Sequence, residues 1–253
     1  MLVVDEEFGH PRLAALYDAL VPDRGDLEAY VDLVVGLGAG RVLDIGCGTG
    51  SLALLLAARD RDVIGVDPAR ASLAVARGKA GADRVVWIDG DATSVTVTDR
   101  DVALMTGNTA QAISDPAQWA ATLQAVHACL RPGGHLAFET RDPAARAWEQ
   151  WTRAATRQVH DVPGTGEVGS WVEVTAVEWP LVSFRRTWTF ASDGATLTSS
   201  STLRFRDRLE VERDLRANGY ELVDVRGAPD RPGQELVFLA RRRVEPAGQP
   251  ALH

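Results

Sequence analysis

The sequence predicts an α/β protein whose doubly wound, mostly parallel sheet of seven strands carries an N-terminal helical cap and a small antiparallel β insert. From residue 41 onward, short β-rich runs alternate with helical stretches, as in parallel sheets covered by helices. Most of these runs are apolar on both faces, as buried parallel strands must be. Between residues 142 and 206 the pattern changes to alternating segments, which indicates a separate antiparallel sheet.

The parallel core is expected over residues 41–141 and 207–243. Its first strands are Arg41–Ile45, Asp62–Asp67, Arg84–Asp89, Asp101–Thr106 and His135–Thr140, separated by helices Ser51–Arg59, Ala69–Ala80 and Pro116–Leu130. Asp115 caps the third helix, and the run Arg131–Gly134 (RPGG) is expected to terminate it. The core closes on a hairpin after a further helix, with the segments Asp207–Ala217, Tyr220–Val225 and Glu235–Ala240.

Two segments stand outside this core, and a tail over residues 244–253 is expected to fray. Residues 1–40 form the cap, whose two amphipathic helices could lie across the sheet edge or cover a ligand. Residues 142–206 form the insert, with a helix opened by Asp142 and Pro143 and then three strands. The cap helices and the insert strands are Pro11–Leu20, Asp26–Leu37, Trp171–Trp179, Ser183–Phe190 and Thr196–Phe205, with a hairpin turn at Ser192–Gly194.

Five of the seven tryptophans lie in the insert, where they either pack it against the main sheet or line a substrate pocket. The predicted helix carries two of them, Trp148 and Trp151.

Composition excludes several classes of function. The net charge of −8, with scattered basic residues, argues against binding a nucleic-acid backbone. The acidic N-terminus and the absence of a long apolar stretch predict neither a signal peptide nor a membrane span, so a soluble cytoplasmic protein is expected. The spacing of Cys47 and Cys129 suggests no disulfide or zinc site, and the five histidines form no metal cluster.

The segment Val42–Gly50 (VLDIGCGTG) places three glycines between a strand and a helix, where a missing Cβ lets the backbone approach a ligand. A dinucleotide-binding loop would need a further glycine where Ser51 stands. Asp44 lies two residues before the first glycine and would suit an ammonium or sulfonium group better than a pyrophosphate.

Two more acidic residues follow the next strands. Asp67 ends the second strand on the side where the glycine loop opens, so its carboxylate could accept both hydroxyls of a ribose. The alternative is that Asp67, followed by Pro68, caps the next helix. Asp91 follows the third strand and would suit the exocyclic amine of adenine. Together these acids predict a nucleoside ligand.

With VLDIGCGTG, the runs GVDPA (65–69), DGDA (89–92) and RPGGHLAFE resemble the motifs of Rossmann-like, class I S-adenosylmethionine-dependent methyltransferases over about two-thirds of the chain, Val42–Arg141 and Asp207–Arg242. The resemblance implies that Gly46 and Gly48 pass the methionine part of the cofactor, that Asp67 holds the ribose, and that Asp91 with Ala92 flanks the adenine. With this resemblance, the residues expected to bind the cofactor are Tyr17, Asp44, Gly46, Cys47, Gly48, Asp67, Pro68, Asp91, Ala92 and Thr106.

The acceptor side is expected after the fourth and fifth strands. The run MTGNTAQ lacks the Asn/Asp-Pro-Pro-aromatic motif common in methyltransferases of nucleic-acid amino groups, which argues against base methylation. It resembles instead the small-molecule N-methyltransferase branch, in which residues at the positions of Asn108 and Arg141 hold a substrate carboxylate. The alternative is a structural ion pair between Arg141 and Asp142 or Glu139.

The sequence therefore predicts an S-adenosylmethionine-dependent methyltransferase that acts on nitrogen or oxygen of a small molecule, with residues 142–206 as a lid. An amine acceptor needs no strong base, whereas a hydroxyl or carbon acceptor would need one such as Glu139 or Tyr17. Two rivals are a nicotinamide-dependent oxidoreductase and a non-catalytic S-adenosylmethionine-binding protein. The acceptor's identity and the oligomeric state are left open.

Overall fold

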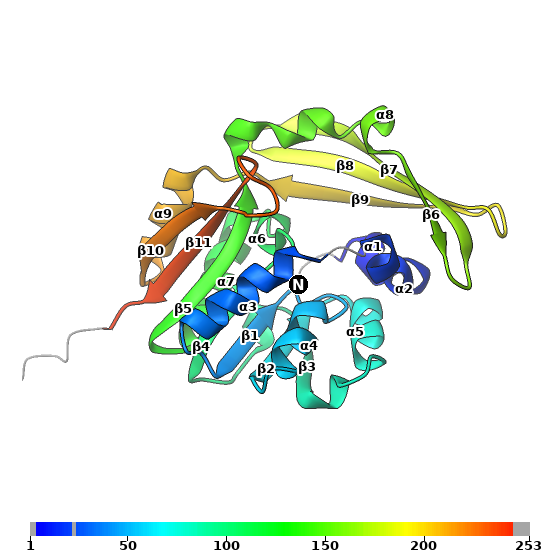
Figure 1. The fold of residues 1–253 in the computed structure, drawn as a ribbon. Helices are drawn as coiled ribbons and strands as arrows, with labels where there is room; N and C mark the ends of the chain where they lie inside the picture. Colours follow the sequence, from blue (N-terminus) through cyan, green and yellow to red (C-terminus); the bar gives the residue numbers. More distant parts are fainter. Residues whose placement is uncertain (1–3, 22–23, 245–253) are drawn as a thin grey trace, which may run out of the picture.

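A computed structural model describes residues 4–21 and 24–244, which form two sheets joined by the N-terminal helices (Figure 1). The seven strands of the main sheet run in the order β10-β11-β5-β4-β1-β2-β3, and the second sheet runs β6-β7-β8-β9. The main-sheet strands are β1 Arg41–Ile45, β2 Asp62–Asp67, β3 Val85–Asp89, β4 Arg100–Met105, β5 Leu130–Arg141, β10 Tyr220–Gly227 and β11 Glu235–Arg242.

Helices cover both faces of the main sheet, and the doubly wound fold class is confirmed. Strand β11 runs antiparallel to both β10 and β5, and its pairing with β10 gives the predicted closing hairpin. The helices are α1 Glu6–Gly9, α2 Pro11–Leu20, α3 Asp26–Gly36, α4 Ser51–Ala57, α5 Arg70–Arg77, α6 Thr109–Ala112, α7 Pro116–Cys129, α8 Arg153–Thr156 and α9 Arg208–Ala217. Helices α7 and α9 contribute to the core on one face, and α3 and α4 on the other.

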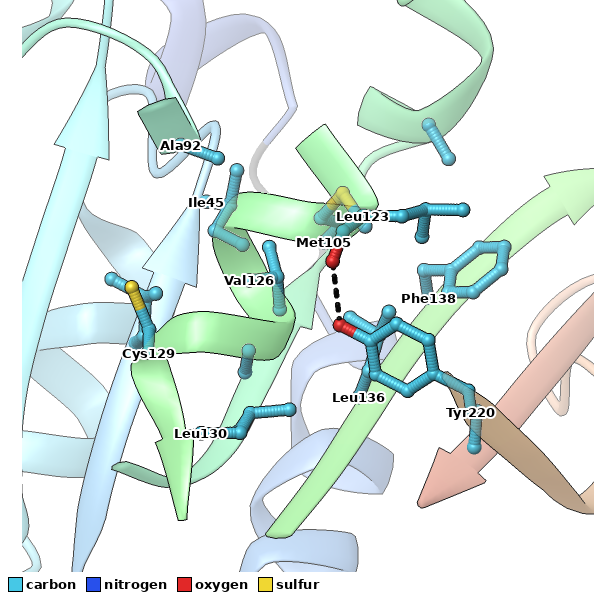
Figure 2. Close-up of a cluster of buried hydrophobic side chains, with 14 of the residues drawn as sticks. Ile45, Ala92, Met105, Leu123, Val126, Cys129, Leu130, Leu136, Phe138 and Tyr220 are labelled. Atoms are coloured by element: carbon cyan, nitrogen blue, oxygen red, sulfur yellow. Dashed lines mark hydrogen bonds between the residues drawn. The ribbon is translucent and has the colours of Figure 1, made fainter. Parts of the chain in front are cut away.

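The core under α7 is tied together by a buried hydrogen bond. The hydroxyl of Tyr220, on the edge strand β10, donates to the carbonyl of Leu123 at 2.9 Å (Figure 2). Phe138 and Phe238 stack beside it with ring centroids 5.4 Å apart. Apolar burial on this scale contributes about 1.5 to 3 kcal/mol for each large side chain, so this cluster anchors the antiparallel end of the sheet.

The run RPGG does not end α7, contrary to the sequence prediction. The helix ends at Cys129, and residues 131–134 lie inside the long strand β5. The pairing with β4 jumps there from Arg100 opposite Leu130 to Val102 opposite His135. The glycines thus allow an irregularity within a strand, with Gly133 at a φ of 76°.

The helices of the predicted N-terminal cap pack in two different places. Helix α3 packs with α4 on the face of the main sheet, whereas α1 and α2 lie between α5 and the second sheet (Figure 1). On one side, Ser72 of α5 donates to the carbonyl of Phe8 at 3.0 Å. On the other side, Glu7 pairs with Arg186 of β8. Helices α1 and α2 therefore bridge the two sheets, and α1 was not expected from the sequence.

The insert holds four strands rather than three: β6 Gln158–Val162, β7 Gly166–Glu178, β8 Leu181–Phe190 and β9 Thr196–Arg204. Strand β6 (QVHDV) escapes prediction because it is short and mostly polar. The expected helix after Asp142 is wrong. Two 3₁₀ turns, Pro143–Ala145 and Ala147–Gln150, stand there, separated by Arg146 in the left-handed conformation with a φ of 46°. The hairpin turn after β8 lies where the sequence places it.

Two of the insert's tryptophans are buried, one within the insert and one against α2. Trp148 contacts Phe205 of the insert edge-on, with ring centroids 4.6 Å apart. Trp188, which is 2% exposed, packs in a cluster with Leu13 and Leu16 of α2. Trp179 is 58% exposed. The interpretation of these rings as packing residues therefore holds for Trp148 and Trp188, with the insert itself and α2 as their partners.

A buried arginine fastens the end of the insert to the core. Arg206 follows β9 and is 2% exposed, and its guanidinium donates to the carbonyls of Ala110 and Ile113 at 2.9 and 2.6 Å. It also lies over the ring of Trp119, 4.7 Å from the centroid. Burial lowers the pKa of Arg206 to about 10, which leaves it charged at neutral pH. Arg206 thereby fixes the segment after β4 around α6.

Arg206→Met should lower the free energy of unfolding by about 2 to 4 kcal/mol, because two carbonyls would lose a charged donor in a buried place. Arg208→Met is the matched control: Arg208 lies on the surface of α9 and pairs with Glu212, so we expect a change within about 0.5 kcal/mol. Urea unfolding followed by circular dichroism measures both. Equal effects of the two substitutions would show that Arg206 has no special structural role.

Candidate functional site

The loop between β1 and α4 is shaped by three glycines with positive φ. Gly46, Gly48 and Gly50 have φ of 69°, 54° and 80°. A Cβ on Gly46 would come within 2.5 Å of Oγ1 of Thr109, so its absence lets the segment after β4 approach the loop. A Cβ on Gly48 would meet nothing within 4 Å. Gly48 therefore faces open space, while the buried Cys47 is held by its N–H, which donates to the carbonyl of Val66 at 3.2 Å.

Asp44 lies beneath this loop, and its buried carboxylate has no ion-pair partner among the residues that the structure describes. It is 1% exposed, and neither of its carboxylate oxygens has a hydrogen bond of normal geometry. Burial, aided by the nearby Asp67, raises its pKa to about 7; Arg24 opposes this, as does a weak interaction with the backbone N–H of Ala53. An unpaired buried carboxylate is costly. The place is thus chemically suited to a ligand that brings a positive charge.

Asp67 ends β2 beside the same loop. Its carboxylate accepts hydrogen bonds from the N–H groups of Gly48 at 2.8 Å and Ala69 at 2.7 Å, with the half-buried Pro68 between the strand and the turn. Burial raises its pKa, and these two bonds oppose the rise. Asp67 thus stabilises the turn into α5, but it does not cap that helix, whose N-cap is Ala69 and has no side-chain cap. Each carboxylate oxygen still has a free lone pair for a ligand hydroxyl.

Asp91 and Ala92 follow β3. Oδ1 of Asp91 accepts from the N–H of Thr93 at 2.9 Å, and Ala92 is 2% exposed within the core. The half-buried Asp91 thus opens the turn Ala92–Ser94 at the same end of the sheet as Asp67. Its neighbour Asp89 instead pairs at the surface with Arg70 at 2.7 Å.

Helix α2 reaches the glycine loop through a residue that the sequence did not single out. Asp18 accepts from Oγ1 of Thr49 at 2.6 Å and pairs with Nζ of Lys79 at 2.5 Å. The adjacent Tyr17 stacks obliquely on Phe8, 5.9 Å between centroids. Burial raises the pKa of Tyr17, which disfavours it as a general base. The only sequence signal for Asp18 was a carboxylate beside Tyr17 on an amphipathic helix.

Beyond β4 and β5 a second buried polar group gathers. Asn108, in the left-handed conformation with a φ of 61°, donates from its backbone N–H to Glu139 at 3.1 Å and from Nδ2 to Glu235 at 3.0 Å. Tyr30 of α3 also donates to Glu139. Burial, with Glu235 next in effect, raises the pKa of Glu139 to about 7. The carbonyl of Thr106 accepts a hydrogen bond from Oγ1 of Thr109 at 2.7 Å, and Thr109 lies against Gly46 of the glycine loop.

Arg141 ends β5 in this group, but the ion pairs considered from the sequence are wrong. Its backbone N–H and Nη1 donate to Oε1 of Gln111 at 3.2 and 3.1 Å, and Nε lies 3.9 Å from Glu235. Neither Glu139 nor Asp142 pairs with it among the residues that the structure describes. Its guanidinium lies 5.3 Å from the centroid of Trp151. Glu235 therefore already offsets much of the charge that a substrate carboxylate would use.

A cavity of about 390 Å³ lies on the α3 side of Glu139. Helix α3 and the β10–β11 connection form its walls, with Asp26, Asp32 and Asp230 as acids and Leu33 and Val237 among its apolar residues. No residue of the glycine loop lines it, so it is distinct from the space above Gly48. Its volume falls in the range of small-molecule sites.

Glu235 and Gln111 are the site residues that sequence reasoning missed on this side. Glu235 opens the last strand with a charge where the pattern called only for an apolar run, and Gln111 is 0% exposed in a four-residue helix. A polar residue at a strand end was the available signal for Glu235. For Gln111 there was none, because its role depends on the position of Arg141 in the fold.

Two expected absences concern metals and membranes. Within residues 4–21 and 24–244, no three His, Cys, Asp or Glu side chains come together as metal ligands would. In the same part of the chain, no helix is long and apolar enough to cross a membrane. Cys47 and Cys129 are both free and buried.

Part of the chain is similar to known methyltransferases. Residues 42–134 match the family model described as a methyltransferase domain. The ubiquinone biosynthesis O-methyltransferase of Alkalilimnicola ehrlichii is 38% identical over 121 residues, 45% of this chain and 47% of that protein. The cypemycin N-terminal methyltransferase of a Streptomyces species is 31% identical over 130 residues, 51% of this chain and 53% of that protein. The chain thus spans about half the length of the curated relatives it matches.

Solved structures extend the likeness to the insert. The CcbJ methyltransferase of Streptomyces caelestis has a TM-score of 0.76 at 19% identity, covering 95% of this chain and 100% of that one. CalS10, an amino pentose methyltransferase of Micromonospora echinaspora, has a TM-score of 0.70 at 22% identity, covering 90% and 96%. Residues 42–134 therefore match a methyltransferase domain, and the chain shares the fold of these methyltransferase structures.

Asp44→Asn should make the ligand-free protein more stable, by about 1 to 3 kcal/mol at pH 8. The pKa of Asp44 is higher folded than unfolded, so the folded state binds more protons and stability falls as pH rises from about 4 to 7. The substitution removes that cost, although a buried amide without partners keeps part of it. Thermal unfolding from pH 4 to 8 measures the effect.

Asp101→Asn is the control of opposite sign. Partial burial raises the pKa of Asp101, but hydrogen bonds from Arg131 and from the N–H groups of Arg41 and Gly40 outweigh it and lower the pKa to about 2. That carboxylate stabilises the fold above pH 4, so its neutralisation should lower stability at neutral pH. If Asp44→Asn also lowered stability throughout this range, Asp44 would not be an unpaired buried charge.

Proposed function

We propose that the protein is an S-adenosylmethionine-dependent methyltransferase that methylates nitrogen or oxygen of a small molecule in the cytoplasm. The unpartnered carboxylate of Asp44 beneath the glycine loop is the observation that carries this proposal. A pyrophosphate would place negative charge against it, whereas the ammonium group of a methionine moiety would neutralise it. The methyltransferase domain match over residues 42–134 supports the same conclusion.

The residues present fit this cofactor. Asp44 would pair with its ammonium group, the open backbone at Gly48 would pass its methionine part, and Asp67 would hold the ribose hydroxyls. Asp91 with Ala92 would flank the adenine, while Tyr17 would cover the site from α2. When bound, S-adenosylmethionine supplies a methyl group on a good leaving group, so the protein mainly needs to align the acceptor and exclude water.

We assign the exclusion of water to the insert, residues 142–206, which would act as a lid together with α1 and α2. The contacts of Glu7 with Arg186 and of Asp5 with Ser201 support this assignment, because they hold α1 beneath the second sheet. Amide hydrogen exchange of α1, β8 and β9 should slow when S-adenosylhomocysteine binds. Unchanged exchange in all three elements would contradict the lid.

The two rivals predict different measurements. A nicotinamide-dependent oxidoreductase should bind NAD or NADP, and calorimetry with each cofactor tests this directly. A non-catalytic binding protein should bind S-adenosylmethionine but produce no S-adenosylhomocysteine from any acceptor. A screen of small amines and alcohols for S-adenosylhomocysteine formation, read by mass spectrometry, separates that case from the proposed enzyme.

Asp67→Ala should weaken S-adenosylmethionine binding by about 1.5 to 3 kcal/mol, because hydrogen bonds from ribose hydroxyls to a charged acceptor are lost. Asp91→Ala is the matched comparison and should weaken binding less, since one amine contact is at stake. Isothermal calorimetry on both folded variants gives the two values. Unchanged affinity in folded Asp67→Ala would remove the ribose assignment.

A further inference from the structure

Asn108 carries a buried hydrogen-bond acceptor that nothing in the described protein satisfies. The residue is 5% exposed, and its Oδ1 has no donor in reach. A carbonyl oxygen buried without a hydrogen-bond donor destabilises the folded protein. The neighbouring Thr109 lies against Gly46 in the glycine loop. Oδ1 of Asn108 therefore belongs to the segment that packs against the loop expected to bind the cofactor.

The orientation of the Asn108 amide is fixed by its partner. Nδ2 donates at 3.0 Å to Oε1 of Glu235, and that oxygen also accepts from Nη1 of Arg231 at 2.7 Å. Turning the amide over would place its oxygen against a carboxylate, which is repulsive. Oδ1 is therefore the free end, and a hydrogen-bond donor from a ligand or a water molecule would satisfy it.

Glu139, beside Asn108, is a buried carboxylate without a cation. Its partners are neutral: the hydroxyl of Tyr30 and the N–H of Asn108. The nearby cations are engaged elsewhere, since Arg231 and Arg141 both lie against Glu235. Among the described residues, none forms an ion pair with Glu139. The cavity next to it adds Asp26, Asp32 and Asp230 and only one arginine, Arg226.

We propose that the methyl acceptor is an amine, and that its nitrogen is held by donating hydrogen bonds to Oδ1 of Asn108 and to the carboxylate of Glu139. This inference rests on the proposed function and narrows its acceptor class. A substrate carboxylate would not suit these two groups, because both are acceptors. An alcohol offers a single proton, whereas an amine can donate to both at once.

The same contacts account for the protons. A bound ammonium has no lone pair, so it first gives one proton to the Glu139 carboxylate. The neutral nitrogen then uses its lone pair to form the new N–C bond, and the electron pair of the broken S–C bond stays on sulfur. The product is a methylated ammonium beside a neutral Glu139, with total charge unchanged. In the ligand-free protein the pKa of Glu139 is raised to about 7, which brings it closer to the pKa of an alkylammonium than an ordinary carboxyl group and so makes the proton transfer less unfavourable.

Methylammonium is a suitable probe, because it is small enough to enter whatever the rest of the acceptor is. Protein labelled with ¹³C-glutamate and saturated with S-adenosylhomocysteine is titrated with pH by NMR, with and without methylammonium chloride. Glu139→Gln assigns the signal, and sodium chloride and methanol serve as ionic and neutral controls. We expect methylammonium to lower the pKa of Glu139 by about one unit, as a paired cation does, and neither control to do so.

Asn108→Gly tests the second contact. Glycine accepts the positive φ and keeps the backbone N–H that Glu139 needs, so the fold should tolerate it. The methylammonium effect should be lost in this variant. It should persist in Thr140→Val, which removes a different buried and unpartnered oxygen.

No effect of methylammonium on the wild type, an equal effect in Asn108→Gly, or the same shift with methanol would each overturn the amine assignment. Calorimetry of S-adenosylhomocysteine binding to the same samples distinguishes a failure of the proposed function from a failure of the amine assignment. Failure of that ligand to bind would count against the proposed function, whereas failure of the titration alone would count only against the amine acceptor.

Discussion

Most of the site depends on one constraint, namely that carboxylates are buried at the carboxyl edge of a parallel sheet with too few cations to neutralise them. Within the described part of the chain, Asp44 has no hydrogen-bond partner of normal geometry, and the donors to Asp67 and Glu139 are neutral groups. A buried carboxylate of this kind is neutralised either by taking up a proton or by binding a cationic ligand. In the ligand-free protein the pKa values of Asp44 and Glu139 are both about 7, so each carboxyl group is partly protonated at neutral pH.

The rest of the fold holds these acids in place and encloses them. Glycines at 46 and 48 let the loop pass over β2 and leave open space above it, while α2 is pinned to that loop through Asp18. The second sheet is joined to the core at both ends, by α1 and α2 on one side and by Arg206 on the other. The two halves of the site share the segment after β4, since Thr109 contacts the glycine loop and Asn108 contacts Glu139.

The sequence predicted the parallel core well because its signals are local. Buried strands, glycine turns and acids at strand ends are each set by residues within a few positions, and β1 and β2 have the predicted bounds. The insert was predicted less well: β6 is too polar to show a strand pattern, and the RPGG run imitates a helix terminator inside β5. The partners of Arg141 could not be predicted, because Gln111 and Glu235 meet it only through the tertiary fold. The cofactor residues, which follow local motifs, remain predictions until a ligand is bound.

The most direct test of a site built for a cation is proton release on cofactor binding. S-adenosylmethionine binding is measured by calorimetry at pH 6 in buffers of different ionisation enthalpy. At that pH most Asp44 carries a proton, and an ammonium group beside it should lower its pKa and expel that proton. The account predicts release of close to one proton per bound cofactor in the wild type and almost none in Asp44→Asn. Binding without proton release, or equal release from both proteins, would contradict it.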